Sequence, residues 1–436
     1  MHKSSQSFLG EVRDQIKSKE AKEFVAAELD HHIKEAKNKW VEKGLDETAA
    51  EEKAVVQMGS PVTLGQQLNK LHRPKVDWLM VMLLVTTMGL GFLPILFIEN
   101  EFLLRYLVDA SYFVTQKVKS ILIGGVLVFG IMLINYRRLE RFGWLFYGIG
   151  IFILVLLQFS SRMMMNGVLI LEIGSYKIDS LMAMPFFLVA WASFFNHNKL
   201  KLWHLLLLFI VSLWLFSNTA NLPAMYIYTA MVFGLFCCSR FSRKIKWGIT
   251  GGIVGSLLLL VLTAWPSMKM YQIERLLAFI NPEQYAGGAG YLPLLARDLM
   301  SKAGWFGNAL NSVRIPDVHA DLVFVGFTYY FGWLAAFALV CLLALFIVRI
   351  MMIVRGIQEP FGKLLLVGAA ALYTVQLVSN VGMTLGLLPI TSISLPFISY
   401  GLMPIVLNAF IMGVVLSVYR RKDLTSMREG LSYESQ

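Results

Sequence analysis

The chain has 436 residues, of which 57% are hydrophobic and 15% are Asp, Glu, Lys or Arg, and its mean hydropathy is +0.62. These values exclude a soluble globular enzyme, a disordered chain and a disulfide-stapled secreted domain, and they predict a multi-pass membrane protein. A formal net charge of +11 would suggest nucleic-acid binding in a soluble protein. Here the basic residues gather in short loops between apolar runs, where they set orientation, so we expect no nucleic-acid partner.

Residues 1–76 differ in composition from the rest, because about a sixth of the chain holds more than a third of its charged residues. Such a break indicates a domain boundary. Helical spacing of apolar residues predicts a helix over 24–40, with Gly44 after its end. Asp46 and Pro61 lie where two further helices should begin. With no apolar core of signal-peptide length, we expect a small cytoplasmic helical domain.

Ten charge-free apolar runs follow, each long enough to cross a hydrocarbon core of about 30 Å. Every even-numbered run is followed by a basic loop, so the positive-inside rule predicts that both termini are cytoplasmic. Lys117 and Lys119 are exceptions, because they flank the second run on its outer side. We predict an all-α membrane bundle over 77–422 and a cytoplasmic tail over 423–436. The expected spans are 78–98, 120–136, 142–160, 180–196, 203–219, 221–238, 247–266, 320–348, 364–386 and 400–419.

The largest predicted outer loop, 267–319, has an unusual density of ionisable residues for this chain. The apolar runs, in contrast, have almost none away from their ends, which argues against a proton- or sodium-driven pump. The three cysteines lie in apolar stretches without a paired His or Cys motif, so neither a zinc site nor an external disulfide is indicated. They are Cys237, Cys238 and Cys341.

Two motifs resemble those of a known family. The segment from Asn380 to Gly401 contains Asn-Val-Gly, Gly-Leu-Leu-Pro and Leu-Pro-Phe-Ile-Ser-Tyr-Gly. It is similar to the C-terminal signature of the SEDS family (shape, elongation, division and sporulation), the RodA, FtsW and SpoVE proteins. The stretch Pro-Asp-Val-His-Ala-Asp-Leu-Val-Phe, 316–324, resembles the end of that family's large outer loop. The N-terminal domain resembles the HAAS-like helical prefix domains found ahead of some bacterial permeases.

The resemblance implies a peptidoglycan glycosyltransferase in the bacterial cytoplasmic membrane, serving cell shape, division or sporulation. Such an enzyme polymerises lipid II, an undecaprenyl pyrophosphate-linked disaccharide peptide, at the outer membrane face, beside a class B penicillin-binding protein. This chemistry needs a base near the acceptor hydroxyl and cations near the departing pyrophosphate. No cofactor and no metal ligand are indicated, and the sequence leaves open whether a divalent cation assists.

Asp321 matches the aspartate at the family's proposed catalytic centre, and we assign it as the base. The alternative is that it merely caps a helix or interacts with the helix dipole. The other candidates are substrate-binding residues from the outer loop and from the C-terminal signature. The alternative for the histidine is that it is merely solvated, and for the cations that they bind lipid headgroups. The alternative for the C-terminal signature is that it only forms a re-entrant turn, and for its tyrosine that it belongs to the aromatic belt at the membrane interface. These candidates are His319, Arg297, Lys302, Arg314, Asn380, Pro396, Ser399 and Tyr400.

Some family features are missing. Tyr329 and Tyr330 replace paired glutamates, and residues 304–307, Gly-Trp-Phe-Gly, are what remains of a loop pattern. A Gln-Pro-Ser-Glu-x-x-Lys run is replaced by residues 177–182, Lys-Ile-Asp-Ser-Leu-Met. Because a carboxylate without positioned neighbours loses most of its catalytic effect, two alternatives stay open. One is a flippase for a lipid-linked precursor, and the other is a non-catalytic partner or regulator of a penicillin-binding protein.

Overall fold

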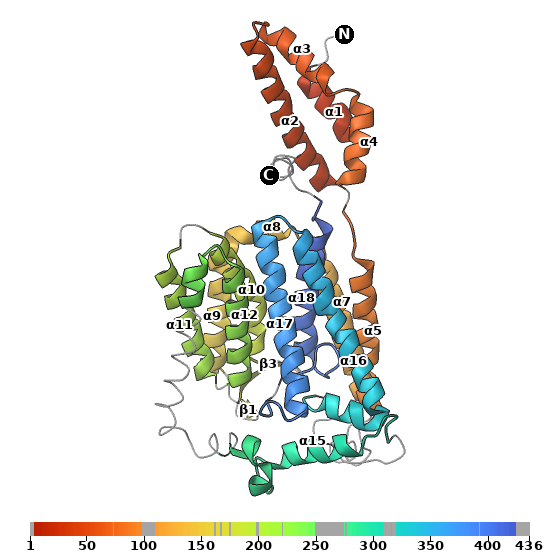
Figure 1. Ribbon diagram of the computed structural model, residues 1–436, viewed down its shortest axis with the longest axis vertical. Coiled ribbons are helices and arrows are strands. Elements are labelled where there is room, and N and C mark those ends of the chain that lie inside the picture. Colours follow the sequence, from red (N-terminus) through yellow and green to blue (C-terminus); the bar gives the residue numbers. More distant parts are fainter. Residues whose placement is uncertain are drawn as a thin grey trace. The chain divides into compact units, whose positions relative to one another are not determined.

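The chain divides into two compact units. One comprises Met1–Asp77 with Tyr419–Gln436, and the other comprises Trp78–Val418. Helices form nearly all of the described regular structure in both units (Figure 1). The computed structural model describes residues 4–72, 74–97, 110–160, 163–165, 168–173, 176–197, 200–219, 221–248, 274, 277–308, 315, 320–391 and 393–423.

Four helices build the first unit. Ser4, Ser18 and Asp46 begin the first three helices, because each side chain accepts a hydrogen bond from a backbone N–H of the first turn. The sequence predicted the last three helices, including the end of the second near Gly44, but it did not predict the first. The four are α1 (Ser5–Gln15), α2 (Lys19–Glu42), α3 (Glu47–Gln57) and α4 (Pro61–Leu71).

The core of the first unit is one apolar cluster to which all four helices contribute. Phe8 from α1 and Val25 from α2 are 1% and 2% exposed. Removing such side chains from water is the main source of stability in a small helical domain. The cluster comprises Phe8, Val12, Ile16, Ala21, Val25, Leu29, Ile33, Ala54, Val55 and Leu68.

The chain returns to the first unit at its other end. The guanidinium of Arg421, a residue that is 2% exposed, donates to both carboxylate oxygens of Glu20 at 2.8 and 2.9 Å. Nδ1 of His72 lies 2.7 Å from the carbonyl oxygen of Asp423. Because a two-point arginine–carboxylate pair fixes geometry as well as charge, these residues are an integral part of the first unit.

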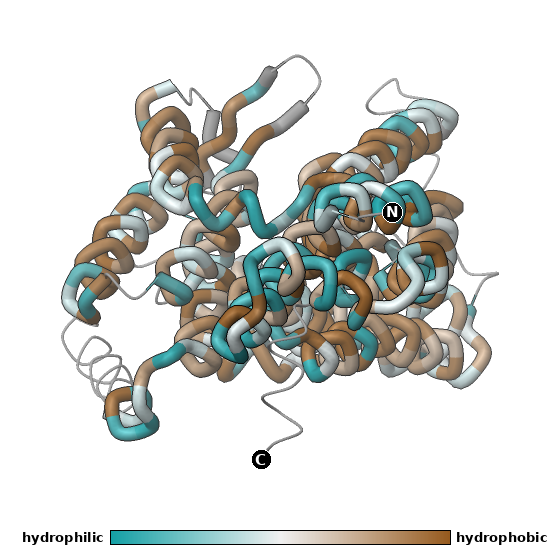
Figure 2. The backbone as a smooth tube through the Cα atoms, turned by 90° about the horizontal axis from the view of Figure 1, so that it is seen from above, coloured by the Kyte–Doolittle hydropathy of each residue, from teal (hydrophilic) through white to brown (hydrophobic). Residues whose placement is uncertain are grey.

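The second unit is a bundle of apolar helices. Among the described residues, six helices are long and apolar enough to cross a membrane, and three more are apolar but shorter. Figure 2 shows hydrophobic residues along most of their length. The protein is therefore a multi-pass helical membrane protein, which confirms the predicted class. The predicted span 247–266 lies almost wholly outside the described residues, so the number of ten crossings stays a prediction.

The helices of this unit lie close to the predicted spans. The largest difference is at the second span, where the helix begins about ten residues before the expected Ser120. The helices are α5 (Trp78–Leu90), η1 (Leu93–Phe97), α7 (Ala110–Leu133), α8 (Tyr136–Leu139), η2 (Glu140–Phe142), α9 (Gly143–Ser160), η3 (Ser180–Ala183), α10 (Met184–Asn196), α11 (Leu202–Asn218), α12 (Leu222–Cys238), η5 (Pro282–Tyr285), α15 (Tyr291–Lys302), α16 (Val323–Gly356), α17 (Pro360–Thr384) and α18 (Leu402–Arg420).

A small antiparallel sheet follows α9, in a segment where the sequence predicted only an outer loop. Its strands are β1 (Met163–Met165), β2 (Val168–Ile173) and β3 (Tyr176–Ile178), in the order β1-β2-β3. Met164 pairs with Leu169, and Glu172 pairs with Lys177. The strands are short and β2 carries β-branched residues, which suit a pleated surface, but runs of three residues give too little alternation to be predicted.

An aromatic cluster joins α10, α11 and α12. The Trp191 indole N–H donates to the Tyr228 hydroxyl at 2.8 Å, and that hydroxyl is also bonded to Ser212 Oγ. Around Tyr228, the rings of Phe187 and Phe216 lie 5.1 and 5.0 Å away, centroid to centroid. Since Trp and Tyr need partners for their polar atoms when buried, this chain of bonds lets the three helices pack closely.

Candidate functional site

The segment between α17 and α18 enters the bundle as irregular backbone. Residues 395–399, Leu-Pro-Phe-Ile-Ser, are all buried and lie outside helices. Phe397 has a φ of 63°, a left-handed conformation that non-glycine residues rarely adopt. Its ring packs against Phe346 and Tyr373, with centroid distances of 5.7 and 6.4 Å, and this burial offsets the local strain. We call residues 393–401 the re-entrant segment.

Ser399 ties the re-entrant segment to the start of α16. Its hydroxyl accepts a hydrogen bond from the Leu395 backbone N–H at 2.9 Å, which closes the turn. The same hydroxyl donates to the carbonyl oxygen of Ala320 at 2.7 Å. Ala320 directly precedes Asp321, so a fully buried serine positions the backbone next to the predicted base.

Asn380 makes the second connection. Its amide, at Nδ2, donates to the carbonyl oxygen of Asp321 at 3.1 Å and to that of Ile393 at 2.7 Å. Asn380 is fully buried in α17, and within the described residues its Oδ1 has no hydrogen-bond partner. One side chain thus bonds both the predicted base's own peptide and the re-entrant segment.

Asp321 lies immediately before α16, which begins at Val323. The N-cap of that helix is Leu322, so Asp321 does not take the N-cap position considered in the sequence analysis. Its side chain is partly buried. Asp321 therefore lies next to the N-terminal end of α16, where the helix dipole is positive.

Lys117 was missed as a site residue. It lies in α7, is 1% exposed, and its Nζ donates to the carbonyl oxygens of Phe397, Ile398 and Ser399 at 3.1, 3.1 and 2.9 Å. In the sequence, Lys117 stands out as an exception to the charge distribution of the loops. That exception was the available signal. Because α7 begins at Ala110, the structure places Lys117 inside an apolar span, where an ionisable residue is usually functional.

Two of the candidate outer-loop cations lie on α15. Arg297 and Lys302 lie on α15 and are exposed, and Lys302 Nζ pairs with Asp298 at 2.7 Å. An exposed pair of this kind contributes little stability, and its lysine can exchange partners. Arg314 and His319 lie outside the described residues.

Pro396 and Tyr400 belong to the re-entrant segment. Pro396 is buried within the turn, and the Tyr400 ring lies 5.4 Å from that of Phe113. These contacts place both residues in the packing of the segment.

The outer loop is attached to a kink in α16. Gly332 has φ 86° and ψ 170°, which interrupts the helix. The Trp333 N–H donates to the Gly304 carbonyl at 3.0 Å, and the Asn308 N–H donates to that of Tyr329 at 2.9 Å. A Cβ on Gly332 would lie 2.3 Å from the Trp305 carbonyl oxygen, so only glycine fits. Trp333 also bonds the Met300 carbonyl, which attaches α15.

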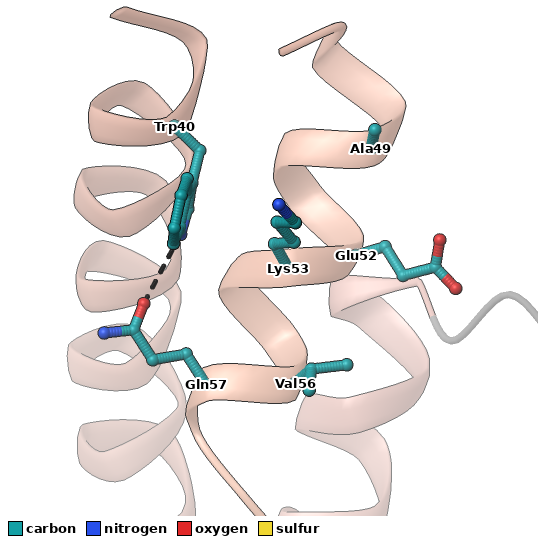
Figure 3. A pocket seen from close by; sticks show the side chains of 6 residues that line it. All are labelled: Trp40, Ala49, Glu52, Lys53, Val56 and Gln57. Atoms are coloured by element: carbon teal, nitrogen blue, oxygen red, sulfur yellow. Dashed lines mark hydrogen bonds between the residues drawn. The ribbon is translucent and has the colours of Figure 1, made fainter. Parts of the chain in front are cut away.

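A cavity of about 490 Å³ in the first unit lies between α2 and α3 (Figure 3). Trp40 lines it, with the Lys43 and Lys53 ammonium groups 4.7 and 4.8 Å from the indole centroid. The indole N–H donates to Gln57 Oε1 at 3.4 Å. The lining mixes one aromatic ring, two small or aliphatic side chains, an amide and one charge of each sign, and it does not resemble a catalytic arrangement. In the described part of the chain, no group of three or more His, Cys, Asp or Glu is placed to hold a metal ion.

Comparison with known proteins gives a consistent family. The family model FTSW_RODA_SPOVE, described as cell cycle protein, matches residues 77–424. The probable peptidoglycan glycosyltransferase FtsW of Nitrosomonas europaea is 26% identical over 382 residues, which cover 83% of this chain and 97% of the relative. That of Bacillus subtilis is 30% identical over 204 residues, 44% of this chain and 51% of the relative. The chain thus spans only about half the length of several curated relatives, such as 52% of the Bacillus subtilis stage V sporulation protein E.

Solved structures share the fold. A chain from a study of the structural coordination of polymerization and crosslinking by a peptidoglycan synthase complex aligns with a TM-score of 0.68 at 24% identity. The alignment covers 80% of this chain and 98% of that one. The rod shape determining protein RodA of Thermus thermophilus aligns with a TM-score of 0.56 at 22% identity, over 79% and 97%. At these identities the likeness shows the fold alone.

Proposed function

This chain belongs to the FtsW, RodA and SpoVE family of cell cycle proteins, and from that premise we propose that it is a peptidoglycan glycosyltransferase. Its substrate would be lipid II, polymerised at the outer face of the cytoplasmic membrane. The observation that carries the proposal is the backbone network around Asp321, in which Asn380 bonds the Asp321 carbonyl and Ser399 bonds that of Ala320. A relative that aligns with 83% of this chain is named probable peptidoglycan glycosyltransferase FtsW, which agrees with this activity.

In this proposal Asp321 is the general base. Its carboxylate would accept the proton of the acceptor sugar hydroxyl as that oxygen attacks the anomeric carbon of the donor, and the undecaprenyl pyrophosphate would depart. The base must be held in place, since a carboxylate that wanders loses most of its rate advantage. Asn380 and Ser399 supply that restraint through the backbone on each side of the residue.

The cations of the outer loop would stabilise the charge on the leaving pyrophosphate. Arg297 and Lys302 are exposed on α15, which is attached to α16 through Trp333. Guanidinium and ammonium groups form charge-assisted hydrogen bonds to phosphate oxygens. Arg314 is the third proposed cation, and His319 is proposed as a contact to the sugar. Pro396 and Tyr400 shape the adjoining re-entrant segment.

The wider arrangement is proposed as follows. Residues 1–76 form a cytoplasmic, HAAS-like prefix domain, 77–422 form the membrane domain with its outer loop 267–319, and 423–436 form a cytoplasmic tail. A class B penicillin-binding protein would be the partner that crosslinks the product. A solved neighbour described as coordinating polymerization and crosslinking supports this pairing.

The test is a polymerisation assay on the full chain. The purified protein, with and without a class B penicillin-binding protein, receives labelled lipid II, and glycan chains are separated on a gel. We expect chains from the wild type, a loss of about a hundredfold or more with Asp321→Asn, and no loss with the exposed carboxylate control Glu283→Gln. Equal product from Asp321→Asn and the wild type would remove the assigned base.

A non-catalytic partner is the second candidate, favoured by Tyr329 and Tyr330. These residues occupy the place of paired glutamates and are 3% and 4% exposed, packed in the first turns of α16. Absence of product under every pairing, together with intact binding to the penicillin-binding protein, would support this candidate over the enzyme.

A further inference from the structure

The ammonium group of Lys117 is enclosed by the protein. Lys117 belongs to the apolar span Ser111–Leu133 and is 1% exposed. Transferring an ammonium group from water into an apolar bundle is costly unless it is fully hydrogen-bonded. The carbonyl oxygens of residues 397, 398 and 399, all within 3.1 Å, provide those bonds.

The number of hydrogen bonds that Lys117 makes indicates its role. A lysine ammonium has three N–H donors and no acceptor, and here each donor meets one backbone carbonyl. The three carbonyls match the three N–H donors of the ammonium form, whereas a neutral amine has only two. All three donors are used inside the protein, so none is left for a substrate phosphate.

The carbonyls need this partner. Residues 397–399 are outside any helix, and irregular backbone at membrane depth is stable only when its polar groups are satisfied by protein. The left-handed Phe397 turns successive carbonyls toward α7, an arrangement that regular structure does not provide. Lys117 therefore satisfies carbonyl groups of the re-entrant segment that backbone hydrogen bonds would satisfy in a helix.

The contact continues to the predicted base. The carbonyl of Ser399 accepts from Lys117, and the hydroxyl of the same serine donates to Ala320, the neighbour of Asp321. We propose that Lys117 is a positioning residue for glycosyl transfer: by binding the three carbonyls of the re-entrant segment, it fixes Ser399 and, through it, the backbone that carries Asp321. This inference rests on the proposed function, because it names what orients the base in that reaction.

Gly91, just beyond the end of α5, offers an independent way to disturb the same contact. A Cβ there would lie 2.8 Å from the Phe397 carbonyl oxygen and 2.9 Å from Lys117 Nζ. Neither distance is tolerated, and one of the two contacts is to backbone, so Gly91→Ala must displace the segment or the lysine. Gly89 is a matched control two residues earlier, because a Cβ there meets nothing within 4 Å.

The experiment compares wild type, Lys117→Gln, Lys117→Arg, Gly91→Ala and Gly89→Ala as full chains in lipid nanodiscs. Backbone amide exchange is measured over 393–401, with α10 as an internal reference for global folding, and kcat and KM for lipid II are measured in parallel. We expect Lys117→Gln and Gly91→Ala to speed exchange in the segment and to lower kcat about tenfold, with KM changed by less than about twofold. Lys117→Arg should restore part of both, and Gly89→Ala should match the wild type.

Two results would overturn the proposal. Unchanged exchange over 393–401 in Lys117→Gln would show that the lysine does not hold the segment. A raised KM with unchanged kcat would make Lys117 a substrate ligand. Should Lys117→Gln fail to fold, as α10 exchange would reveal, Gly91→Ala and Lys117→Arg decide the same question. If the wild type makes no glycan, the proposed function fails, while the exchange data still judge whether Lys117 fixes the re-entrant segment.

Discussion

Two buried regions of the membrane unit solve the problem of internal polar groups differently. In the aromatic cluster of α10, α11 and α12, three side chains, Trp191, Tyr228 and Ser212, satisfy one another. Around the re-entrant segment, side chains instead satisfy backbone: Lys117, Asn380 and Ser399 all bond carbonyl oxygens of irregular chain. The first arrangement joins helices that are already regular. The second stabilises irregular backbone, whose polar groups have no partners in regular secondary structure. Such an arrangement is expected where the position of the backbone matters for chemistry.

The largest expected effect on stability is in the aromatic cluster. Trp191→Ala removes a side chain that is 1% exposed and leaves a cavity, so we expect a loss of about 3–5 kcal/mol and a clearly lower melting temperature in detergent. Lipid II polymerisation per folded molecule should stay unchanged. Trp214→Ala on α11, 62% exposed, is the control and should melt near the wild type. An activity loss larger than the loss of folded protein would break the distinction between the two regions.

The next effect is at the re-entrant segment. Asn380→Leu keeps the side-chain size but leaves the Asp321 and Ile393 carbonyls without this donor, and we expect polymerisation per folded molecule to fall about tenfold or more. Asn408→Leu, which removes a bond to Gln376 between α18 and α17, is a matched buried control. It should lose stability but not activity. Equal activity losses in both variants would mean that activity depends on the packing of α17 and α18 as a whole, and not on the contact to Asp321.

A smaller effect separates polar from apolar contributions in the aromatic cluster. Tyr228→Phe keeps the ring and removes the hydroxyl that accepts from Trp191, leaving the buried indole N–H without this partner. We expect a loss of about 1–2 kcal/mol in stability and none in activity, measured by melting and by the glycan assay. Tyr226→Phe, half exposed on the same helix, should have no effect. A larger loss than for Trp191→Ala would contradict a packing role.

The smallest effect is a pH dependence before α10. Burial raises the pKa of Asp179 to about 6, although its carboxylate accepts the Leu181 N–H at 3.0 Å. With a folded pKa above the unfolded value of about 3.9, its favourable contribution is complete below about pH 4 and is lost as the pH rises through 6. Asp179→Asn keeps the capping bond without the charge, so it should raise the melting temperature slightly at pH 8. The same gain at pH 4 or below would show that the charge is not responsible.

Periodicity and hydropathy predicted the helices well because long apolar runs and caps such as Asp46 act locally. The motif match also found Asp321, Asn380 and Ser399, which the structure brings together. The partners of each could not be predicted, because Lys117 and Ser399 are 282 residues apart and their contact depends on the left-handed turn at Phe397. Local preference disfavours that turn in a non-glycine residue, so only tertiary contacts specify it.

The attachment of the outer loop to α16 is made by peptide groups on both sides. The N–H groups of Asn308, Trp333 and Leu334 bond the carbonyls of Tyr329, Gly304 and Trp305. Peptide groups are common to every amino acid, so most side chains of this junction can drift in evolution without loosening it. Gly307 and Gly332 cannot be replaced in this way, since a Cβ on either would collide with backbone atoms across the junction. The attachment of this loop therefore depends on backbone contacts and two glycines rather than on its other side chains.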